Sequence, residues 1–167
     1  MANLSILEKI EKIYIATKDK GFSKELLVSH KRELNTLAKY YGLKANHAYW
    51  LSVIFYYNIE NDTNCTFNEL KDVLKITPVV LIKQMEEIEF LVANEFLVKK
   101  KTNSNSYAAS KLSNVRFSVH PDISDAIVFG DKINTKQAEK IETLLDAIES
   151  INAWISKIED NELDVEI

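Results

Sequence analysis

This 167-residue sequence contains only one cysteine, two prolines and three glycines. Because Cys65 stands alone, an internal disulfide is excluded, and a reducing, cytoplasmic location is expected. Glycine and proline interrupt regular structure, so their scarcity favours long helices over a fold with many turns. The length allows one domain with an appendage, or two small domains, with a substantial core.

A long apolar run is also missing. The longest one, residues 48–57 with Ser52 inside it, has about half of the roughly 20 residues that a membrane-spanning helix needs. The N-terminus is charged from Glu8 onward and has no apolar signal core. We therefore expect a soluble, unexported protein with no membrane partner.

The sequence lacks the motifs that usually carry catalysis. The three glycines are isolated, so there is no phosphate-binding loop of the GxxxxGK[ST] or GxGxxG type. The three histidines are far apart, and none has metal-ligand spacing with Cys65 or a carboxylate. Cys65 is expected to be half-buried beside Thr66, without an activating base. No catalytic, metal-ligating or cofactor-binding residue is predicted, and the chain is not expected to be an enzyme.

Three amphipathic or apolar segments predict an N-terminal helical subdomain over residues 1–60. The expected helices cover residues 4–18, about 23–41 and about 44–57. The third segment is the most apolar in the chain, including Trp50, Ile54 and Phe55. A helix that is apolar nearly all round is buried on several sides, so we expect this one at the centre of the core.

Residues 61–130 predict a winged helix-turn-helix. Thr66 and Glu69 form a capping box that begins a short helix, and Thr77 followed by Pro78 marks the start of a second one. The second helix has an apolar stripe at helical spacing. Its members are Leu81, Met85, Ile88 and Val92.

Two strand-like runs follow the second helix. Residues 96–101 and 115–119 are expected to form a two-stranded β wing around a polar tip at residues 102–106. A short helix is then expected from Pro121 to Gly130. The predicted fold class is therefore mainly α, with a helical bundle joined to the winged helix-turn-helix and a long C-terminal helix. Residues 1–130 are expected to form one compact unit.

Charge is unevenly distributed along the chain. The formal net charge is −4, but residues 1–130 carry 17 Lys/Arg against 15 Asp/Glu, whereas residues 131–167 carry 4 against 10. Neither part has the strong basic excess of a dedicated nucleic-acid-binding protein.

The second helix of the helix-turn-helix would be the DNA-reading helix in a transcriptional regulator. Between Pro78 and Asn94 it has one cation and three carboxylates, which would oppose contact with phosphates. We therefore predict that this helix binds another protein. The residues expected at that surface are Lys83, Gln84, Glu86, Glu87 and Phe90.

The wing supports an alternative interpretation, a small DNA-binding regulator. Lysines on an exposed ribbon also protect its edges from pairing with other chains, and we prefer that interpretation. The residues that would contact nucleic acid are Lys99, Lys100, Lys101, Asn103, Asn105, Lys111 and Arg116.

Residues 131–167 predict a C-terminal helix, beginning near residue 134 or 135, and an acidic tail. Apolar residues at alternating steps of three and four form an a/d seam of about two and a half heptads. The seam consists of Ile141, Leu144, Ile148, Ile151, Ile155 and Ile158. Two interpretations stay open: the helix folds back across the helical body, or it forms a homodimer or leads to further protein.

Three short strings carry a family resemblance. Residues 33–43, ELNTLAKYYGL, are followed by LSVIF at 51–55 and FNEL at 67–70, and then by the wing. Over roughly residues 5–130 this pattern resembles the N-terminal region of bacterial AAA-family ATPases of the Bacteroides type. The resemblance implies a domain that recruits a substrate or partner to an ATPase motor. The nucleotide-binding residues of that family have no counterpart here.

Overall fold

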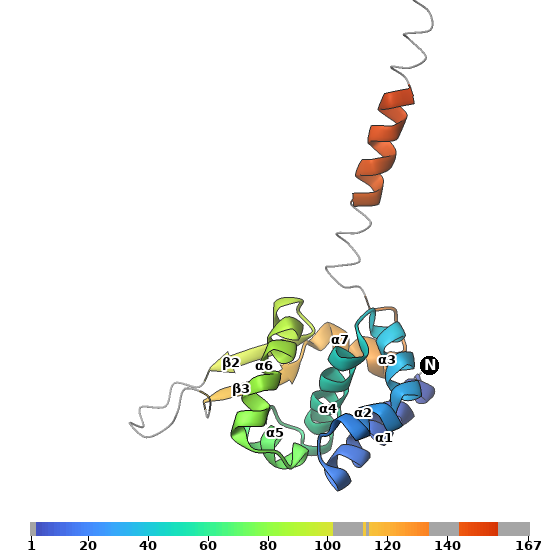
Figure 1. The fold of residues 1–167 in the computed structure, drawn as a ribbon. Coiled ribbons are helices and arrows are strands. Elements are labelled where there is room, and N and C mark those ends of the chain that lie inside the picture. The colour runs from blue at the N-terminus through green and yellow to red at the C-terminus, as the bar shows by residue number, and fades with distance from the viewer. Residues whose placement is uncertain (1–2, 102–111, 113, 134–143, 157–167) are drawn as a thin grey trace, which may run out of the picture. The chain divides into compact units, whose positions relative to one another are not determined.

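The computed structural model describes residues 3–101, 112, 114–133 and 144–156. The chain divides into two units, Met1–Ile133 and Asn134–Ile167. The first unit is mainly helical, with a small antiparallel sheet (Figure 1). Its elements are α1 (Leu4–Lys20), α2 (Lys24–Ser29), α3 (Lys31–Tyr41), α4 (Ala45–Asn61), β1 (Cys65–Thr66), α5 (Phe67–Leu74), α6 (Pro78–Ala93), β2 (Leu97–Lys101), β3 (Val115–Val119) and α7 (Pro121–Phe129).

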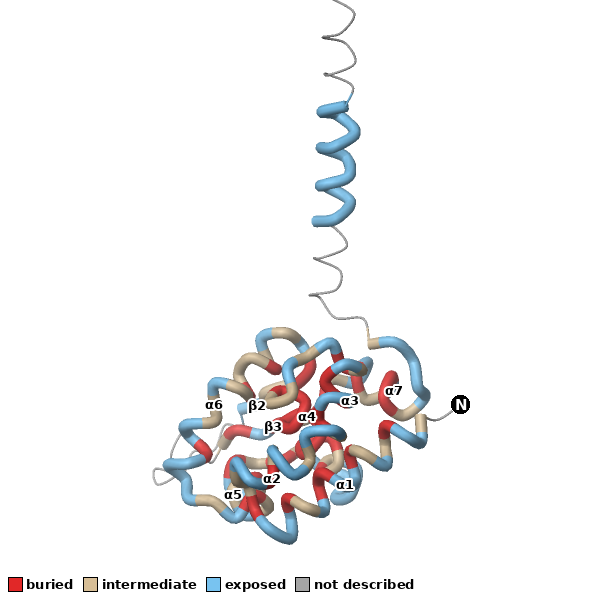
Figure 2. The backbone as a smooth tube through the Cα atoms, turned by 45° about the vertical axis from the view of Figure 1, so that its right-hand side comes forward, coloured by how far each residue is buried: buried red, intermediate tan, exposed pale blue. Residues whose placement is uncertain are grey.

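Helix α4 lies at the centre of the first unit. It contacts α1 and α3 on one side and α6 and β3 on the other. Residues 47–55 of α4 are all buried, which gives the red central segment in Figure 2. Their polar groups are mostly paired: the hydroxyls of Tyr49 and Thr17 lie 3.1 Å apart, and those of Tyr41 and Ser52 lie 3.2 Å apart. This segment thus lies at the centre of the core, as its apolar character predicted.

The predicted helix over residues 23–41 is divided in two at His30. The backbone of His30 has φ −110° and ψ 21°, which ends α2 at Ser29 and lets α3 begin at Lys31. Around this point the Ser29 hydroxyl donates to the Leu26 carbonyl, and the His30 backbone N–H donates to the same carbonyl. Side-chain hydrogen bonds that compete for backbone groups deflect helices in this way.

The capping signals at α5 and α6 are confirmed. The Glu69 N–H donates to the Thr66 hydroxyl, and the Thr66 N–H donates to the Glu69 carboxylate. The Val80 N–H donates to the Thr77 hydroxyl at the start of α6. Between the two helices the chain turns at Lys75, which has a positive φ of 52°.

The end of α1 approaches the end of α5 closely at Gly21. The φ of Gly21 is +79°, and a Cβ added there would lie 2.9 Å from the Leu74 carbonyl oxygen. The next residue, Phe22, donates its backbone N–H to that same oxygen at 2.8 Å. Glycine is therefore needed here both for its conformation and for the space beside Leu74.

The two predicted strands pair antiparallel as β2 and β3, but the sheet has a third strand that was not predicted, in the order β1-β3-β2. Strand β1 has only two residues, which is too short for an alternating pattern to appear in the sequence. It pairs with β3 through Cys65 opposite Phe117 and Thr66 opposite Arg116. The Asn58 side chain in α4 accepts from the Val119 N–H at 3.1 Å and connects the central helix to β3.

Helix α7 returns the chain to α3. Its N-terminus is capped by His120, and Gly130 ends it in the left-handed conformation. The Tyr40 hydroxyl of α3 lies 3.0 Å from both the Ala126 and the Asp131 carbonyl oxygens. These contacts hold the segment after α7 beside the C-terminal part of α3.

In the second unit, residues 144–156 are helical and all of them are exposed. The expected helix start near residues 134–135, and the seam residues Ile141 and Ile158, lie outside the described residues. Among the described residues, no helix is long and apolar enough to cross a membrane.

Candidate interaction surfaces

Helix α6 is held in the core by three buried side chains, Leu81, Ile88 and Leu91. The predicted stripe included Met85 and Val92 instead of Leu91, but both are only half-buried. The difference arises because α6 packs against α4 and β2 on two sides, so its buried side is wider than a single row of residues.

The outward side of α6 has aliphatic residues at helical spacing. We call Val79, Ile82, Lys83 and Glu86 the α6 face; all four are exposed, with Val79 at 61% and Ile82 at 48%. Of the residues predicted for partner binding, Lys83 and Glu86 lie on this face, and Gln84 is half-buried. The exposed Val79 and Ile82 were not predicted, although their spacing of three was visible in the sequence.

Phe90 and Glu87 do not present free groups to a partner, in contrast to the sequence prediction. The Phe90 ring stacks on the His47 ring of α4, with centroids 4.0 Å apart and planes 5° from parallel. The Glu87 carboxylate lies 2.7 Å from His47 Nε2. Both side chains are thus used to join α6 to the central helix, because His47 occupies the first turn of α4 directly beside them.

His47 is buried, and its electrostatic environment favours the neutral imidazole. Burial lowers its pKa from the ordinary 6.5, while the Glu87 carboxylate acts in the opposite direction and the Lys44 cation adds to the lowering. The Nδ1 atom makes no hydrogen bond to any residue that the structure describes. Protonation of this ring would place a charged N–H in a site without an acceptor.

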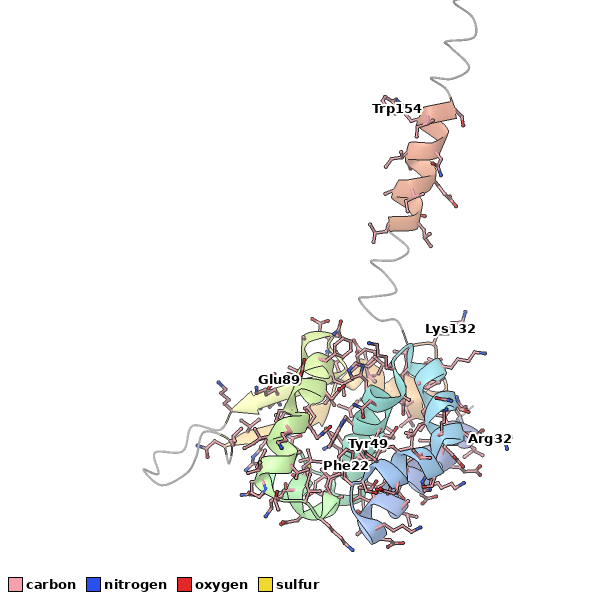
Figure 3. The ribbon with its side chains drawn as sticks, in the orientation of Figure 1. Phe22, Arg32, Tyr49, Glu89, Lys132 and Trp154 are labelled. Carbon is pink, nitrogen blue, oxygen red and sulfur yellow. The ribbon has the colours of Figure 1, made fainter. Side chains whose placement is uncertain are left out.

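The basic residues of the β2–β3 hairpin are only partly available. Lys99 forms an ion pair with Glu89, the α6 residue labelled at the surface in Figure 3. Lys100 and Lys101 are exposed, and Lys100 is paired in register with the exposed Arg116. Burial acts to raise the pKa of the Glu69 carboxyl, but hydrogen bonds from Thr66 and Tyr57 lower it, with a smaller contribution from the Arg116 cation, so Arg116 lies near an anion. Asn103, Asn105 and Lys111 lie outside the described residues.

Cys65 is fully buried rather than half-buried, because β1 pairs with the central strand β3. Burial, with a smaller effect of the Glu69 carboxylate, raises the pKa of its thiol well above the ordinary value. Such a thiol is protonated at neutral pH and unreactive. Among the described residues, no group of three or more His, Cys, Asp or Glu side chains is placed to hold a metal ion.

Helix α3 has an outward side of different chemistry, which the sequence analysis did not single out. Five exposed residues form this α3 face: Lys31, Arg32, Asn35, Thr36 and Lys39. They line a shallow depression together with Val28 and Ser29 of α2. The signal was present in the sequence as polar residues at steps of three and four, opposite the buried Leu34, Leu37 and Tyr41.

Residues 144–156 expose a continuous apolar side. Four of the predicted seam residues lie there, Leu144, Ile148, Ile151 and Ile155, with exposed fractions of 44–62%. Leu145 and Trp154 are exposed beside them. Isolated helices shorter than about 12–15 residues are marginal in water, and packing of an apolar side is what usually stabilises a helix in a protein.

Comparison with protein-family models, with curated proteins and with solved structures gave no match for this chain. The resemblance to the N-terminal region of AAA-family ATPases therefore stays an expectation drawn from short sequence strings.

Proposed function

We propose that the first unit is a non-catalytic interaction domain of the winged-helix type that binds another protein through the α6 face. The order α5, tight turn, α6 and β2–β3 hairpin supports the winged-helix assignment. The short strand β1, which comes before α5 and pairs with β3, fits the same arrangement.

One observation carries the choice of a protein partner: the α6 face combines exposed Val79 and Ile82 with the Glu86 carboxylate. A helix that reads DNA needs Arg, Lys, Asn or Gln toward the base edges and cations toward the phosphates. Aliphatic side chains gain little in that environment, and a carboxylate opposes it. On a protein surface, by contrast, exposed aliphatic residues can enter an apolar pocket.

The same surface indicates the chemistry of the partner. An apolar groove would bury Val79 and Ile82, which lie one turn apart on α6. A cation at its edge would meet Glu86, and a carboxylate would meet Lys83. The resemblance described above adds the proposal that this recruitment serves an AAA-family ATPase.

A capture experiment with the full chain tests this proposal. Partners are cross-linked and identified from the native lysate, and the purified partner is then titrated against the wild type and a Val79→Ser/Ile82→Ser variant. Since fully burying a Val or Ile side chain contributes roughly 1.5–3 kcal/mol, we expect at least a tenfold rise in Kd for the double variant. The folded state should be unaffected because both residues are exposed.

The matched control is Val28→Ser, which alters an exposed valine of α2 that is 73% accessible. This variant should bind like the wild type. Equal loss of affinity in both variants, or no loss in either, would show that the α6 face is not the binding surface.

We also propose that residues 144–156 associate with the same residues of a second copy of the chain. The a and d positions are Leu144, Ile148, Ile151 and Ile155, which suit knobs-into-holes packing. The flanking positions hold uncharged residues, so identical helices meet without like-charge repulsion. They are Leu145, Ala147, Asn152 and Trp154.

Sedimentation equilibrium of the full chain over a roughly hundredfold concentration range tests this association. Ile148→Asp/Ile155→Asp should yield monomers, because the new charges lie in the seam. Ser150→Asp/Asn153→Asp adds the same charge on the polar side and should leave the oligomer intact. A wild type that is monomeric throughout would contradict the proposal and favour a helix that folds back on its own chain.

A further inference from the structure

The α3 face has a local charge that the composition of the chain conceals. It presents Lys31, Arg32 and Lys39 to solvent, together with the amide of Asn35 and the hydroxyl of Thr36. Within residues 31–41, all of which the structure describes, Glu33 is the one carboxylate. Glu33 forms an ion pair with Lys12 of α1, so its charge is compensated. The outward side of α3 is therefore a cationic surface on a chain with net charge −4.

A further cation lies on the same side of the molecule. Tyr40 holds the carbonyl of Asp131 at 3.0 Å, which brings the next residue, Lys132, to the end of α3. Figure 3 shows Lys132 and Arg32 on the same edge of the unit, both extending away from its body. Lys132 is exposed like the three cations of the α3 face, but so is the carboxylate of the neighbouring Asp131, and the two residues together add no net charge.

The α3 face presents these groups along about two turns of the helix. Lys31 and Lys39 are eight residues apart, and at 1.5 Å per residue they are separated by roughly 12 Å along the helix. A helix that enters the roughly 12 Å wide major groove of a duplex lies along the groove, so side chains at its two ends can reach the phosphates that border it. Arg32 and Asn35 lie between the two lysines and have donors that bind the edges of guanine and adenine.

We propose that the α3 face binds double-stranded DNA, with Lys31 and Lys39 contacting phosphates that border the major groove. Arg32 and Asn35 point toward the base edges, and Thr36 donates to phosphate. This site is distinct from the α6 face and from the basic hairpin.

Two other polyanionic partners fit this surface less well. A membrane-binding helix needs a broad apolar side to enter the lipid, whereas Val28 of α2 is the one apolar residue among those that line the depression at the α3 face. An acidic peptide would use the three cations but would leave the Asn35 and Thr36 donors without a specific role. Both are therefore included as alternatives in the test.

Fluorescence anisotropy of a labelled random-sequence DNA duplex, titrated with the full chain at several salt concentrations, tests the proposal. The variant is Lys31→Ala/Arg32→Ala/Lys39→Ala. We expect at least tenfold weaker binding at low salt than for the wild type. Because each phosphate contact contributes about 0.9 to the slope of log K against log salt, the variant's slope should be smaller by about two to three.

The matched control is Lys100→Ala/Lys101→Ala/Arg116→Ala in the β2–β3 hairpin, which removes the same charge from exposed positions. It should bind DNA nearly like the wild type. Loss in the hairpin variant alone would move the site to the hairpin and overturn the proposal, as would a wild type that does not bind DNA. Circular dichroism confirms that both variants are folded.

Two competitors test the chemical class of the ligand. Polyglutamate and vesicles with anionic lipids are each added so that their concentration of negative charges equals that of the DNA phosphates. If either displaces the duplex as efficiently as unlabelled DNA does, the assignment to DNA is wrong. The Val79→Ser/Ile82→Ser variant should bind DNA normally, so this result is independent of the proposed protein partner.

Discussion

Helices α3 and α6 flank α4 and are anchored to it in the same way, but their outward sides differ. Figures 1 and 2 show one helix on either side of the central helix. Each inward side includes fully buried leucines, such as Leu37 in α3 and Leu81 in α6. The α3 face is cationic and polar, whereas the α6 face is aliphatic with one charge of each sign.

This difference shows where the sequence is free to encode function. The inward sides must fill the space around α4, and any aliphatic residue of the right volume serves that purpose. The outward sides contribute little to stability, so their chemistry is set by what they contact in solution. Two surfaces of opposite character on one small unit are consistent with two partners of different kinds.

The largest losses of stability are expected from truncating the buried leucines that hold α3 and α6 against α4. Leu37→Ala and Leu81→Ala each remove a fully buried side chain and should each lower the free energy of unfolding by about 2–5 kcal/mol. Denaturant unfolding followed by tryptophan fluorescence measures this, since Trp50 in α4 is fully buried. A loss below about 1 kcal/mol at either site would contradict the equal anchoring of the two helices.

A smaller loss of stability is expected when a polar contact between α6 and α4 is removed. Glu87→Ala removes the carboxylate beside His47 Nε2 and should cost about 1–2 kcal/mol at pH 7, because the histidine is buried.

The His47–Glu87 pair also predicts that the free energy of unfolding depends on pH. His47 has a lowered pKa in the folded protein, so the unfolded chain binds its proton more readily. The contribution of His47 to the free energy of unfolding is fully present above about pH 6.5 and is lost as the pH falls toward the lowered pKa. Unfolding measured between about pH 5 and 8 should show this decline in the wild type but not in His47→Gln. Parallel curves for the two proteins would count against it.

The smallest loss of stability is expected for the ion pair between Glu33 of α3 and Lys12 of α1. Lys12 and Glu33 are bonded at the surface, with the Lys12 side chain 58% exposed. The hydrogen bond from Lys12 lowers the pKa of Glu33, so any stabilisation is present above about pH 4.5 and is lost at lower pH. Lys12→Ala should change the free energy of unfolding at pH 7 by less than about 0.5 kcal/mol. A loss as large as that of Glu87→Ala would remove the contrast between the two helices.

Local signals predicted the elements that depend on neighbouring residues. The capping box at Thr66 and the Thr77-Pro78 start lie within one turn of the helices they begin, so they act wherever the chain folds. Strand β3 was predicted with the bounds it has, because Val115, Phe117 and Val119 alternate with exposed or half-buried residues.

Features that depend on distant residues were not predictable in this way. The exposure of Phe90 was wrongly predicted because its partner, His47, is 43 positions away in the sequence and belongs to another helix. Strand β1 was missed because two residues become a strand only when β3 lies beside them. The α3 face was not predicted because acidic residues elsewhere in the chain outweigh its cations in the net charge.

The sequence by itself determined that this protein is mainly helical, where most of its helices begin, and that its longest apolar segment forms the central helix. Only the tertiary structure decided which polar side chains remain available to a partner. Helix periodicity depends on contacts three and four residues apart, whereas the availability of a charged group depends on which other elements pack against it. Glu87 and Lys99 are joined to other elements, and Lys31, Arg32 and Lys39 are left to solvent, for that reason.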